Sequence, residues 1–322
     1  MPIYLWIIIF IVSLAVLIKS SDIFVGAAEK IGLGFGLSAF ITGVLIVGVG
    51  TSLPELVSSI IATTKGATEI VIGNVLGSNI TNIFLVLGIA GLMGKNFTIK
   101  HDLMRVDIPF LLSATLLMSL MILDGSFSMI EGILCLLLFS FYIIFTIMHP
   151  VSESKSIGFE TSEQNEDQNK KKKKLSKEFI LIIVSSTGIF IGAKYTVDSV
   201  IAISGILGIA TDIIALTAIA LGTSLPEVLV TISASRRGNP EMAVGNIIGS
   251  NIFNGLVVMG IPSLIAPLQI PHSIIIFSLP TLIAAVLIYS FMVQDKKINQ
   301  LEGGTLLIFY FYFIGRILGI MV

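Results

Sequence analysis

Two sequence motifs occur twice in this chain, and the two copies of each motif lie the same distance apart. GTSLPE stands at Gly50–Glu55 and again at Gly222–Glu227, and GNVLGSNITN at Gly73–Asn82 returns as GNIIGSNIFN at Gly245–Asn254. The offset is 172 positions in both cases. Two separate motifs that keep one offset, with no insertion between them, indicate a tandem duplication of a unit of roughly 150 residues.

The composition places both halves of the chain in a membrane. Hydrophobic residues make up 55% and charged residues 12% of the 322 residues, whereas charged residues make up about a quarter of a soluble protein. Apolar runs of about 20 residues, which are long enough to cross a hydrocarbon core, recur along the chain. We therefore predict an all-α polytopic membrane protein with ten transmembrane helices, five in each half.

The predicted spans cover residues 3–27, 36–63, 67–93, 105–124 and 128–148 in the first half, and 178–203, 207–235, 240–266, 272–292 and 301–321 in the second. The domains are accordingly a first five-helix repeat over 1–149, a cytoplasmic linker over 150–177 and a second five-helix repeat over 178–322. No basic region or cleavage site accompanies the first span, which we interpret as a retained helix. The single cysteine, Cys135, rules out an internal disulfide and a Cys-rich metal site.

The distribution of Lys and Arg predicts the topology. Loops on the cytoplasmic side of a membrane protein carry an excess of Lys and Arg. If the N-terminus is outside, nearly all Lys and Arg residues of the loops fall on the inner side or in the lysine-rich linker, and the outer loops carry only Lys65. Both termini are then extracellular. Because five spans per half is an odd number, the two halves must face opposite ways in the membrane. Such an inverted repeat is typical of secondary transporters, which bind their substrate at the midplane between the repeats.

The first motif has the features of a broken helix. Proline has no N–H, so Pro54 and Pro226 release the carbonyls of Gly50 and Gly222. In lipid, a released carbonyl is tolerated only where it lines a cavity or is buried in protein. The released carbonyls, the neighbouring Thr and Ser hydroxyls and the Glu after each proline form an all-oxygen ligand set. Such a set favours a hard cation such as Ca²⁺ or Na⁺.

The second motif adds neutral oxygens to this set. Residues four apart share a helix face, so Ser78 with Asn82, and Ser250 with Asn254, each offer a hydroxyl and an amide oxygen to one place. The glycines of the motif, at 73, 77, 245 and 249, form small-xxx-small patterns. We expect these patterns to let this helix approach the broken helix closely.

Gly, Ser, Thr and Pro are common in membrane helices for packing alone, so without Glu55 and Glu227 these motifs would also fit a purely structural interface. A charged side chain at the bilayer centre costs at least about 2.5 kcal/mol, so two at homologous positions indicate a function. No Lys or Arg lies in either motif, which leaves a bound cation as the counter-ion. Two carboxylates balance one Ca²⁺, and without Ca²⁺ their mutual repulsion favours a proton or several Na⁺.

The histidines and the remaining charged residues of the predicted spans are not expected to bind ions. None of the three histidines, at 101, 149 and 272, lies in a motif, which argues against a transition-metal site or a histidine proton relay. Asp107 is expected at the membrane interface. Lys194 and Asp198 are four apart and are expected to pair on one helix face. The alternative is that they line an aqueous path together with Asp22, near the end of the first span.

The motifs GTSLPE and GNVLGSN, with their second copies, resemble the two alpha-repeats of the cation/calcium antiporter superfamily, specifically its sodium/calcium exchanger branch. The resemblance covers nearly the whole chain outside the linker. It implies alternating access, no cofactor, and competition of Ca²⁺ and Na⁺ for overlapping sites. It also implies a set of ligands: Glu55 and Glu227 for both ions, Thr51 and Thr223 at the central site, and, for Na⁺, Ser52, Ser78, Ser224 and Ser250 with the carbonyls of Gly48 and Ala220.

Asn82 and Asn254 take the remaining central positions of the family pattern. Some archaeal members and the potassium-dependent exchangers carry Asp at the place of Asn254, so this chain departs from that pattern. Because an amide cannot ionise, the site then holds two negative charges instead of three. This departure argues against K⁺ dependence.

The leading hypothesis is a secondary antiporter that exchanges Na⁺ for Ca²⁺, and the alternative is a proton-coupled Ca²⁺ exchanger that uses the same carboxylates. A passive channel is disfavoured because the duplication builds the site within one chain rather than in a ring of subunits. The sequence holds no ATP-binding loop and no HExxH motif, which argues against a pump or an enzyme. The expected partners are Ca²⁺, Na⁺ and the lipid bilayer, without nucleic acid. We expect a monomer in a prokaryotic plasma membrane.

Overall fold

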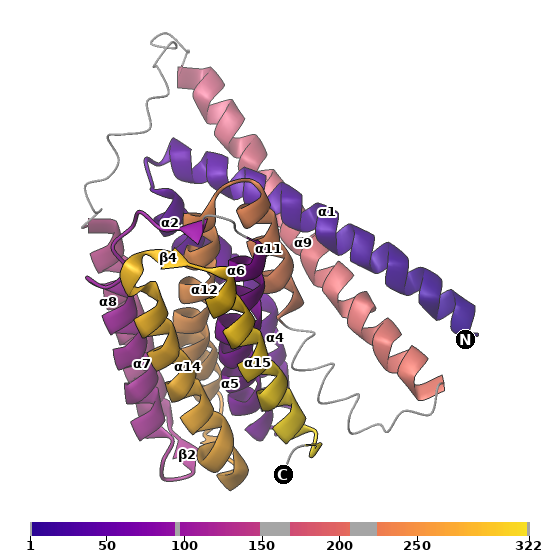
Figure 1. Cartoon of the computed structure of the whole chain (residues 1–322), viewed down its shortest axis with the longest axis vertical. Helices are drawn as coiled ribbons and strands as arrows, with labels where there is room; N and C mark the ends of the chain where they lie inside the picture. Colours follow the sequence, from indigo (N-terminus) through magenta and orange to yellow (C-terminus); the bar gives the residue numbers. More distant parts are fainter. Residues whose placement is uncertain (1, 94–96, 149–167, 207–223, 321–322) are drawn as a thin grey trace.

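The computed structural model describes residues 2–93, 97–148, 168–206 and 224–320, and these residues are mostly helical (Figure 1). Seven helical segments among them are long and apolar enough to cross a membrane: Ile3–Gly34, Ala39–Thr64, Glu69–Met93, Met129–Met148, Ser176–Thr196, Pro240–Ser263 and Ile274–Asp295. Asp107–Met121 is a shorter apolar helix. The first part of the predicted span 207–235 lies outside the described residues.

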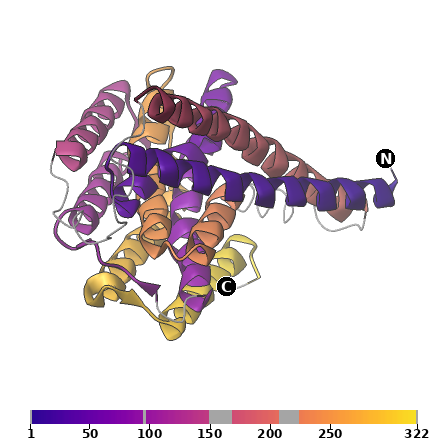
Figure 2. The same cartoon turned by 90° about the horizontal axis from the view of Figure 1, so that it is seen from above.

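The two longest helices, α1 (Ile3–Gly34) and α9 (Gln168–Ile206), lie side by side (Figures 1 and 2). Small residues permit their close contact, since a Cβ built on Gly192 would lie 2.9 Å from the Leu17 backbone nitrogen. Polar contacts also join them, and Lys30 Nζ lies 3.1 Å from Glu178 Oε1. The pair extends away from the other helices at the N-terminal end of α1 (Figure 2).

The second span is a helix with an interruption at the predicted place. It consists of α2 (Ala39–Thr42), a π-helical segment η1 (Gly43–Gly48), α3 (Val49–Thr51) and α4 (Leu53–Thr64). Ser52 separates α3 from α4 with φ −88° and ψ 3°. Ser224 has the same geometry, φ −88° and ψ 0°, before α11 (Leu225–Arg236). The proline is the second residue of the following helix in both copies, where a missing N–H costs no helical hydrogen bond.

The GN motifs form the most buried helices of the bundle. The first copy lies in α5 (Glu69–Thr81), followed by η2 (Asn82–Val86) and α6 (Leu87–Met93). The second lies in α12 (Pro240–Phe253), followed by η3 (Asn254–Val258) and α13 (Met259–Ser263). A π-helical segment thus begins at the last Asn of each motif. Such segments are frequent at functional sites because they change the direction in which side chains point.

The remaining elements complete the bundle around these helices. They are α7 (Asp107–Met121), α8 (Met129–Met148), η4 (Ile274–Ser278), α14 (Leu279–Met292), η5 (Val293–Asp295) and α15 (Gln300–Ile317). Asn299 caps α15 in a capping box with Glu302, which places its first turn.

Four two-residue strands depart from the all-α prediction. β1 (Phe97–Thr98) pairs antiparallel with β4 (Lys297–Ile298), and β2 (Ser126–Phe127) pairs antiparallel with β3 (Leu268–Gln269). The labels β4 and β2 lie at opposite ends of the bundle (Figure 1). Each pair joins a loop of the first half to a loop of the second. A strand is predicted from alternation of apolar and polar residues over at least about four positions, so strands of two residues could not be predicted.

Helix ends differ from the predicted span limits. The predicted linker 150–177 is helical from Gln168 onward, because α9 begins there, while residues 149–167 lie outside the described part. Lys is a good helix former, so a helix can continue through a basic run that hydropathy assigns to a linker. In α7 the helix covers 107–121 instead of the predicted 105–124. Hydropathy reports apolar length and does not detect helix ends.

The predicted close approach of a GN helix to a broken helix is made by the GN helix of the second half, which contacts the broken helix of the first half. A Cβ built on Gly249 would lie 2.5 Å from the Val44 carbonyl oxygen, and one built on Gly245 would lie 3.0 Å from the Gly43 Cα. α12 therefore packs backbone to backbone against η1, and only glycine fits there. Gly73 and Gly77 make no such approach to the described residues.

Candidate functional site

The two predicted carboxylates lie at the centre of the bundle in equivalent positions. Glu55 is the third residue of α4 and Glu227 the third residue of α11, and both side chains have 0% exposure. The first turn of a helix favours an acidic side chain because the helix dipole is positive there. The break before each helix places this favourable end inside the membrane protein. Local helix geometry thus offsets part of the cost of burying each carboxylate.

Serine hydroxyls contact both carboxylates. Ser52 Oγ donates to Glu227 Oε1 at 3.2 Å, which joins the first broken helix to the second. Ser78 Oγ, from α5, donates to Glu55 Oε1 at 3.4 Å. The structure therefore places the Ser52 and Ser78 hydroxyls within hydrogen-bond distance of the two carboxylates.

A second group of oxygens surrounds the end of η1. Thr51 Oγ1 lies 3.1 Å from Asn246 Oδ1 and 3.3 Å from Ser250 Oγ. Ser250 Oγ donates to the Gly48 carbonyl at 3.2 Å, and the same carbonyl accepts the Ser52 N–H at 3.2 Å. Gly48 thus lies among the predicted ligands, but its carbonyl oxygen already accepts hydrogen bonds. Acting as an ion ligand requires the Ser250 hydroxyl to turn away from it.

Amide side chains form a third group where α5 meets α12. Asn79 Nδ2 donates to the Asn251 carbonyl at 3.1 Å, and Asn82 Nδ2 donates to Asn251 Oδ1 at 3.1 Å. Because its nitrogen is bound, Asn82 presents its oxygen to other groups. Asn254, the equivalent residue of the second half, is fully buried.

Four buried oxygens at the predicted ligand positions have no hydrogen-bond partner among the described residues. They are Ser224 Oγ, Glu227 Oε2, Asn82 Oδ1 and Asn254 Oδ1. Within the same described part, no group of three or more His, Cys, Asp or Glu side chains gathers that could hold a metal ion. The ligands offered by this site are therefore two carboxylates with hydroxyl, amide and carbonyl oxygens, a set that suits hard cations.

Ten of the twelve predicted site residues lie in the described part of the chain, and Ala220 and Thr223 lie outside it. The sequence-based prediction missed the first Asn of each GN motif. Asn74 Nδ2 donates to the Glu55 carbonyl at 3.3 Å, and Asn246 Nδ2 donates to the Glu227 carbonyl at 3.5 Å. Each Asn therefore holds the helix that carries a carboxylate. The available signal was that these residues also recur at the duplication offset.

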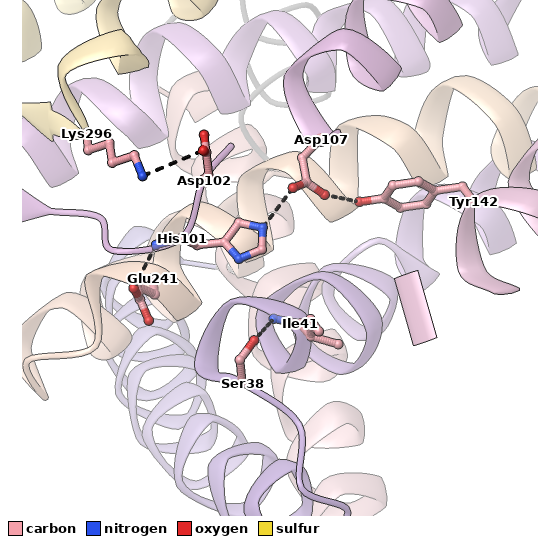
Figure 3. Close-up of polar contacts among 8 residues, drawn as sticks. All are labelled: Ser38, Ile41, His101, Asp102, Asp107, Tyr142, Glu241 and Lys296. Atoms are coloured by element: carbon pink, nitrogen blue, oxygen red, sulfur yellow. Dashed lines mark hydrogen bonds and ion pairs between the residues drawn. The ribbon is translucent and has the colours of Figure 1, made fainter. Parts of the chain in front are cut away.

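A separate polar network surrounds Asp107 at the start of α7 (Figure 3). His101 Nε2 lies 2.9 Å from Asp107 Oδ2, and Tyr142 Oη donates to Asp107 Oδ1 at 3.0 Å. The His101 ring stacks on Phe40 with ring centroids 3.9 Å apart. Asp107 begins α7, at a span end as expected, but it is buried by these partners and is not an exposed interfacial residue. The His101 side chain is buried as well.

The loop that carries His101 contacts the helix of the second GN motif. Glu241 Oε1, in the first turn of α12, accepts the backbone N–H of His101 at 3.1 Å (Figure 3) and that of Lys100 at 2.8 Å. Lys296 Nζ lies 3.9 Å from Asp102 Oδ2. The two contacts of Glu241 hold this loop against the first turn of α12, which carries several predicted ligands further along.

The predicted pair of Lys194 and Asp198 does not form an ion pair among the described residues. Lys194 Nζ instead lies 5.7 Å from the centroid of the Tyr195 ring. Asp22 of α1, by contrast, has a defined partner, since Ser233 Oγ of α11 donates to its Oδ1 at 2.5 Å. The expected pairing of Lys194 with Asp198 on one helix face is therefore wrong: Lys194 is exposed and lies over the Tyr195 ring instead.

A membrane bundle with a buried centre of carboxylate and neutral oxygens defines a membrane transport protein. The chain belongs to the sodium/calcium exchanger protein family, whose model matches residues 5–148 and 177–319. This confirms the resemblance drawn from the doubled motifs. Because the matched residues include both halves, the family assignment rests on nearly the whole chain.

Relatives agree with this assignment over most of their length. The chain is 33% identical to the sodium/calcium exchanger MaX1 of Methanosarcina acetivorans, over 95% of this chain and 96% of that protein. It is 34% identical to the inner membrane protein YrbG of Escherichia coli, over 81% and 80%. The solved structure of the sodium-calcium exchanger NCX_Mj soaked with 10 mM Na⁺ and zero Ca²⁺ is similar, with a TM-score of 0.82, 30% identity, and coverage of 98% of this chain and 99% of that chain. Both sequence relatives are prokaryotic.

Proposed function

We propose that this chain is a secondary antiporter that exchanges Na⁺ for Ca²⁺ across the membrane by alternating access, without a cofactor. The observation that carries the proposal is a set of buried oxygens, on Ser224, Glu227, Asn82 and Asn254, that have no hydrogen-bond partner within the part of the chain that the structure describes. A buried acceptor left without a partner costs roughly 1–3 kcal/mol. A cation coordinated by these oxygens removes that cost, so the site is built to hold one.

The charge of the site favours Ca²⁺ and its replacement by more than one Na⁺. Glu55 and Glu227 supply two negative charges, and Asn254 adds none. One Ca²⁺ neutralises both carboxylates, whereas a single Na⁺ leaves one of them uncompensated in a low-dielectric interior. Because both ions need the same oxygens, the binding of one excludes the other, which is the requirement for coupled exchange.

The ligand assignment follows the family resemblance together with these contacts. We assign ion binding to Glu55, Glu227, Thr51, Thr223, Ser52, Ser224, Ser78, Ser250, Asn82, Asn254 and the carbonyls of Gly48 and Ala220. Thr223 and Ala220 enter by the duplication alone. For the Gly48 carbonyl, the assignment includes a turn of the Ser250 hydroxyl on binding.

The proposed architecture is ten transmembrane helices in two inverted repeats, with both termini extracellular and the linker cytoplasmic, in a plasma membrane, and the monomer as the functional unit. The distribution of Lys and Arg supports this orientation. The site contacts come from the segment that runs from η1 to η2 and from α11 and α12, whereas α1 and α9 lie along the side of this core. We infer that α1 and α9 are the helices that move to expose the site to either side.

Ca²⁺ uptake into liposomes tests the proposal. Purified protein is reconstituted into vesicles loaded with Na⁺ and diluted into Na⁺-free medium containing ⁴⁵Ca²⁺, at equal pH on both sides. We expect uptake that depends on the Na⁺ gradient and stops when choline replaces Na⁺. Uptake that follows an imposed pH gradient and ignores Na⁺ would instead identify a proton-coupled exchanger. Flux without any counter-ion would identify a channel.

A further inference from the structure

Asn246 in α12 connects the two halves of the chain at the candidate site. Its side chain is fully buried, and its Nδ2 donates to Thr231 Oγ1 at 2.9 Å and to the Glu227 carbonyl at 3.5 Å. Its Oδ1 accepts from Thr51 Oγ1 at 3.1 Å. A carbonyl can only accept hydrogen bonds, so the amide nitrogen must face Glu227. The amide oxygen must then face Thr51.

The Thr51 hydroxyl has one hydrogen and three oxygens within reach, on Gly48, Ser250 and Asn246. The Gly48 carbonyl has two lone pairs, and Ser52 N–H and Ser250 Oγ–H already occupy them. With the Ser250 hydrogen directed at Gly48, the nearest acceptor left for the Thr51 hydrogen is Asn246 Oδ1. Asn246 therefore decides where the Thr51 hydroxyl points.

We propose that Asn246 is a positioning residue of the ion site and that it acts by orienting the Thr51 hydroxyl. A hydroxyl binds a cation through its lone pairs, and its hydrogen must point elsewhere. Asn246 holds that hydrogen, so the lone pairs of Thr51 are available before an ion arrives. Residues that orient a ligand in this way raise metal affinity although they do not touch the metal. The inference rests on the proposed function, because it takes Thr51 as an ion ligand.

Asn74 repeats part of this arrangement in the first half. Its Nδ2 donates to the Glu55 carbonyl at 3.3 Å and to Ser59 Oγ at 3.2 Å. Asn246 makes the same two kinds of contact, to the carbonyl of a site glutamate and to a hydroxyl four residues later. The duplication has therefore kept these two contacts in both halves. This supports a specific role for the amide over the filling of space.

A double-mutant cycle on Ca²⁺ binding tests the role of Asn246. The dissociation constant for Ca²⁺ is measured by calorimetry on the full chain in detergent for the wild type, Asn246→Leu, Thr51→Val and the double variant. We expect each single substitution to raise the dissociation constant by about 10- to 100-fold. The double variant should show little more than the larger single effect, because both substitutions remove the same oriented hydroxyl. Effects that multiply would overturn the proposal.

Two further variants keep the test decisive. Thr51→Ser retains the hydroxyl, so Asn246→Leu should raise the dissociation constant in that background by the same factor as in the wild type. If Asn246→Leu aggregates on size-exclusion chromatography, Asn246→Ala completes the cycle. A wild type that binds no Ca²⁺ would overturn the proposed function itself, whereas multiplicative effects in a protein that binds Ca²⁺ would overturn only the role of Asn246.

Discussion

Ser52 Oγ donates a hydrogen bond to Glu227 Oε1 at 3.2 Å, across 175 positions of sequence. Both side chains are fully buried. The serine belongs to the first copy of the hexapeptide and the glutamate to the second, so the two copies meet at one site.

Glu227→Gln should reduce Na⁺-driven Ca²⁺ uptake by at least about 100-fold, since loss of a direct ligand should exceed the loss caused by outer-shell changes. The protein should stay folded because the volume is kept and Ser52 retains an acceptor. ⁴⁵Ca²⁺ uptake in vesicles measures the effect. Glu131→Gln is the matched control, because Glu131 accepts from Ser128 at the start of α8, away from the site. Near-normal transport by Glu227→Gln would contradict the two-carboxylate site.

Asn254→Asp should make transport more sensitive to pH, or dependent on K⁺, because it adds a third carboxylate to a site that holds two. Initial rates of Ca²⁺ uptake are compared between pH 6 and pH 8, with and without K⁺. Asn299→Asp serves as the control, since an Asp still caps α15 at that position. An unchanged response of the Asn254 variant to both conditions would mean that the residue lies outside the site.

Gly249→Ala should destabilise the bundle by about 1–3 kcal/mol, because the added methyl meets backbone atoms of Val44 that cannot yield. Thermal denaturation in detergent measures the loss. Gly304→Ala is the matched control: a Cβ there has no atom of the described residues within 4 Å. Equal stability of the two variants would show that α12 does not pack against η1 as described.

His101→Leu should cost about 1–3 kcal/mol of stability, because it removes a partner from the buried Asp107 carboxylate. Lys296→Gln, which breaks the exposed 3.9 Å pair with Asp102, should cost less than about 1 kcal/mol. Thermal denaturation of both variants compares the two losses. A larger loss for the Lys296 variant would contradict the structural role of the His101 network.

The local features of the site could be predicted from sequence. A proline fixes where a helix breaks, and a glutamate one residue later must lie in the first turn of the next helix. The sequence predicts a broken helix at both GTSLPE motifs, and the structure has Glu55 and Glu227 in the first turn of the helix after each break. The glycine spacing of the second motif likewise predicted the close packing of Gly245 and Gly249. In each case the sequence signal lies within a few residues of one helix, although the segment that the glycines contact, η1, lies about 200 positions away.

Other features depended on long-range packing. The pairing of β1 with β4, the burial of Asp107 and the orienting role of Asn246 each join segments far apart in the chain. Asn246 shows the difficulty most clearly, because its position in the motif does not distinguish an ion ligand from a residue that orients one. Only its contacts to Thr51 and Glu227 make the distinction.

The sequence by itself determined that this is a duplicated membrane protein with two buried carboxylates, because bilayer length, proline geometry and a constant offset act locally along the chain. The tertiary structure alone decided which residues of one half meet those of the other. Helix periodicity states which side chains share a face, but not which face of a distant helix lies opposite. That choice is made by packing, where the Gly249 backbone lies against Val44 and brings Ser52 to Glu227.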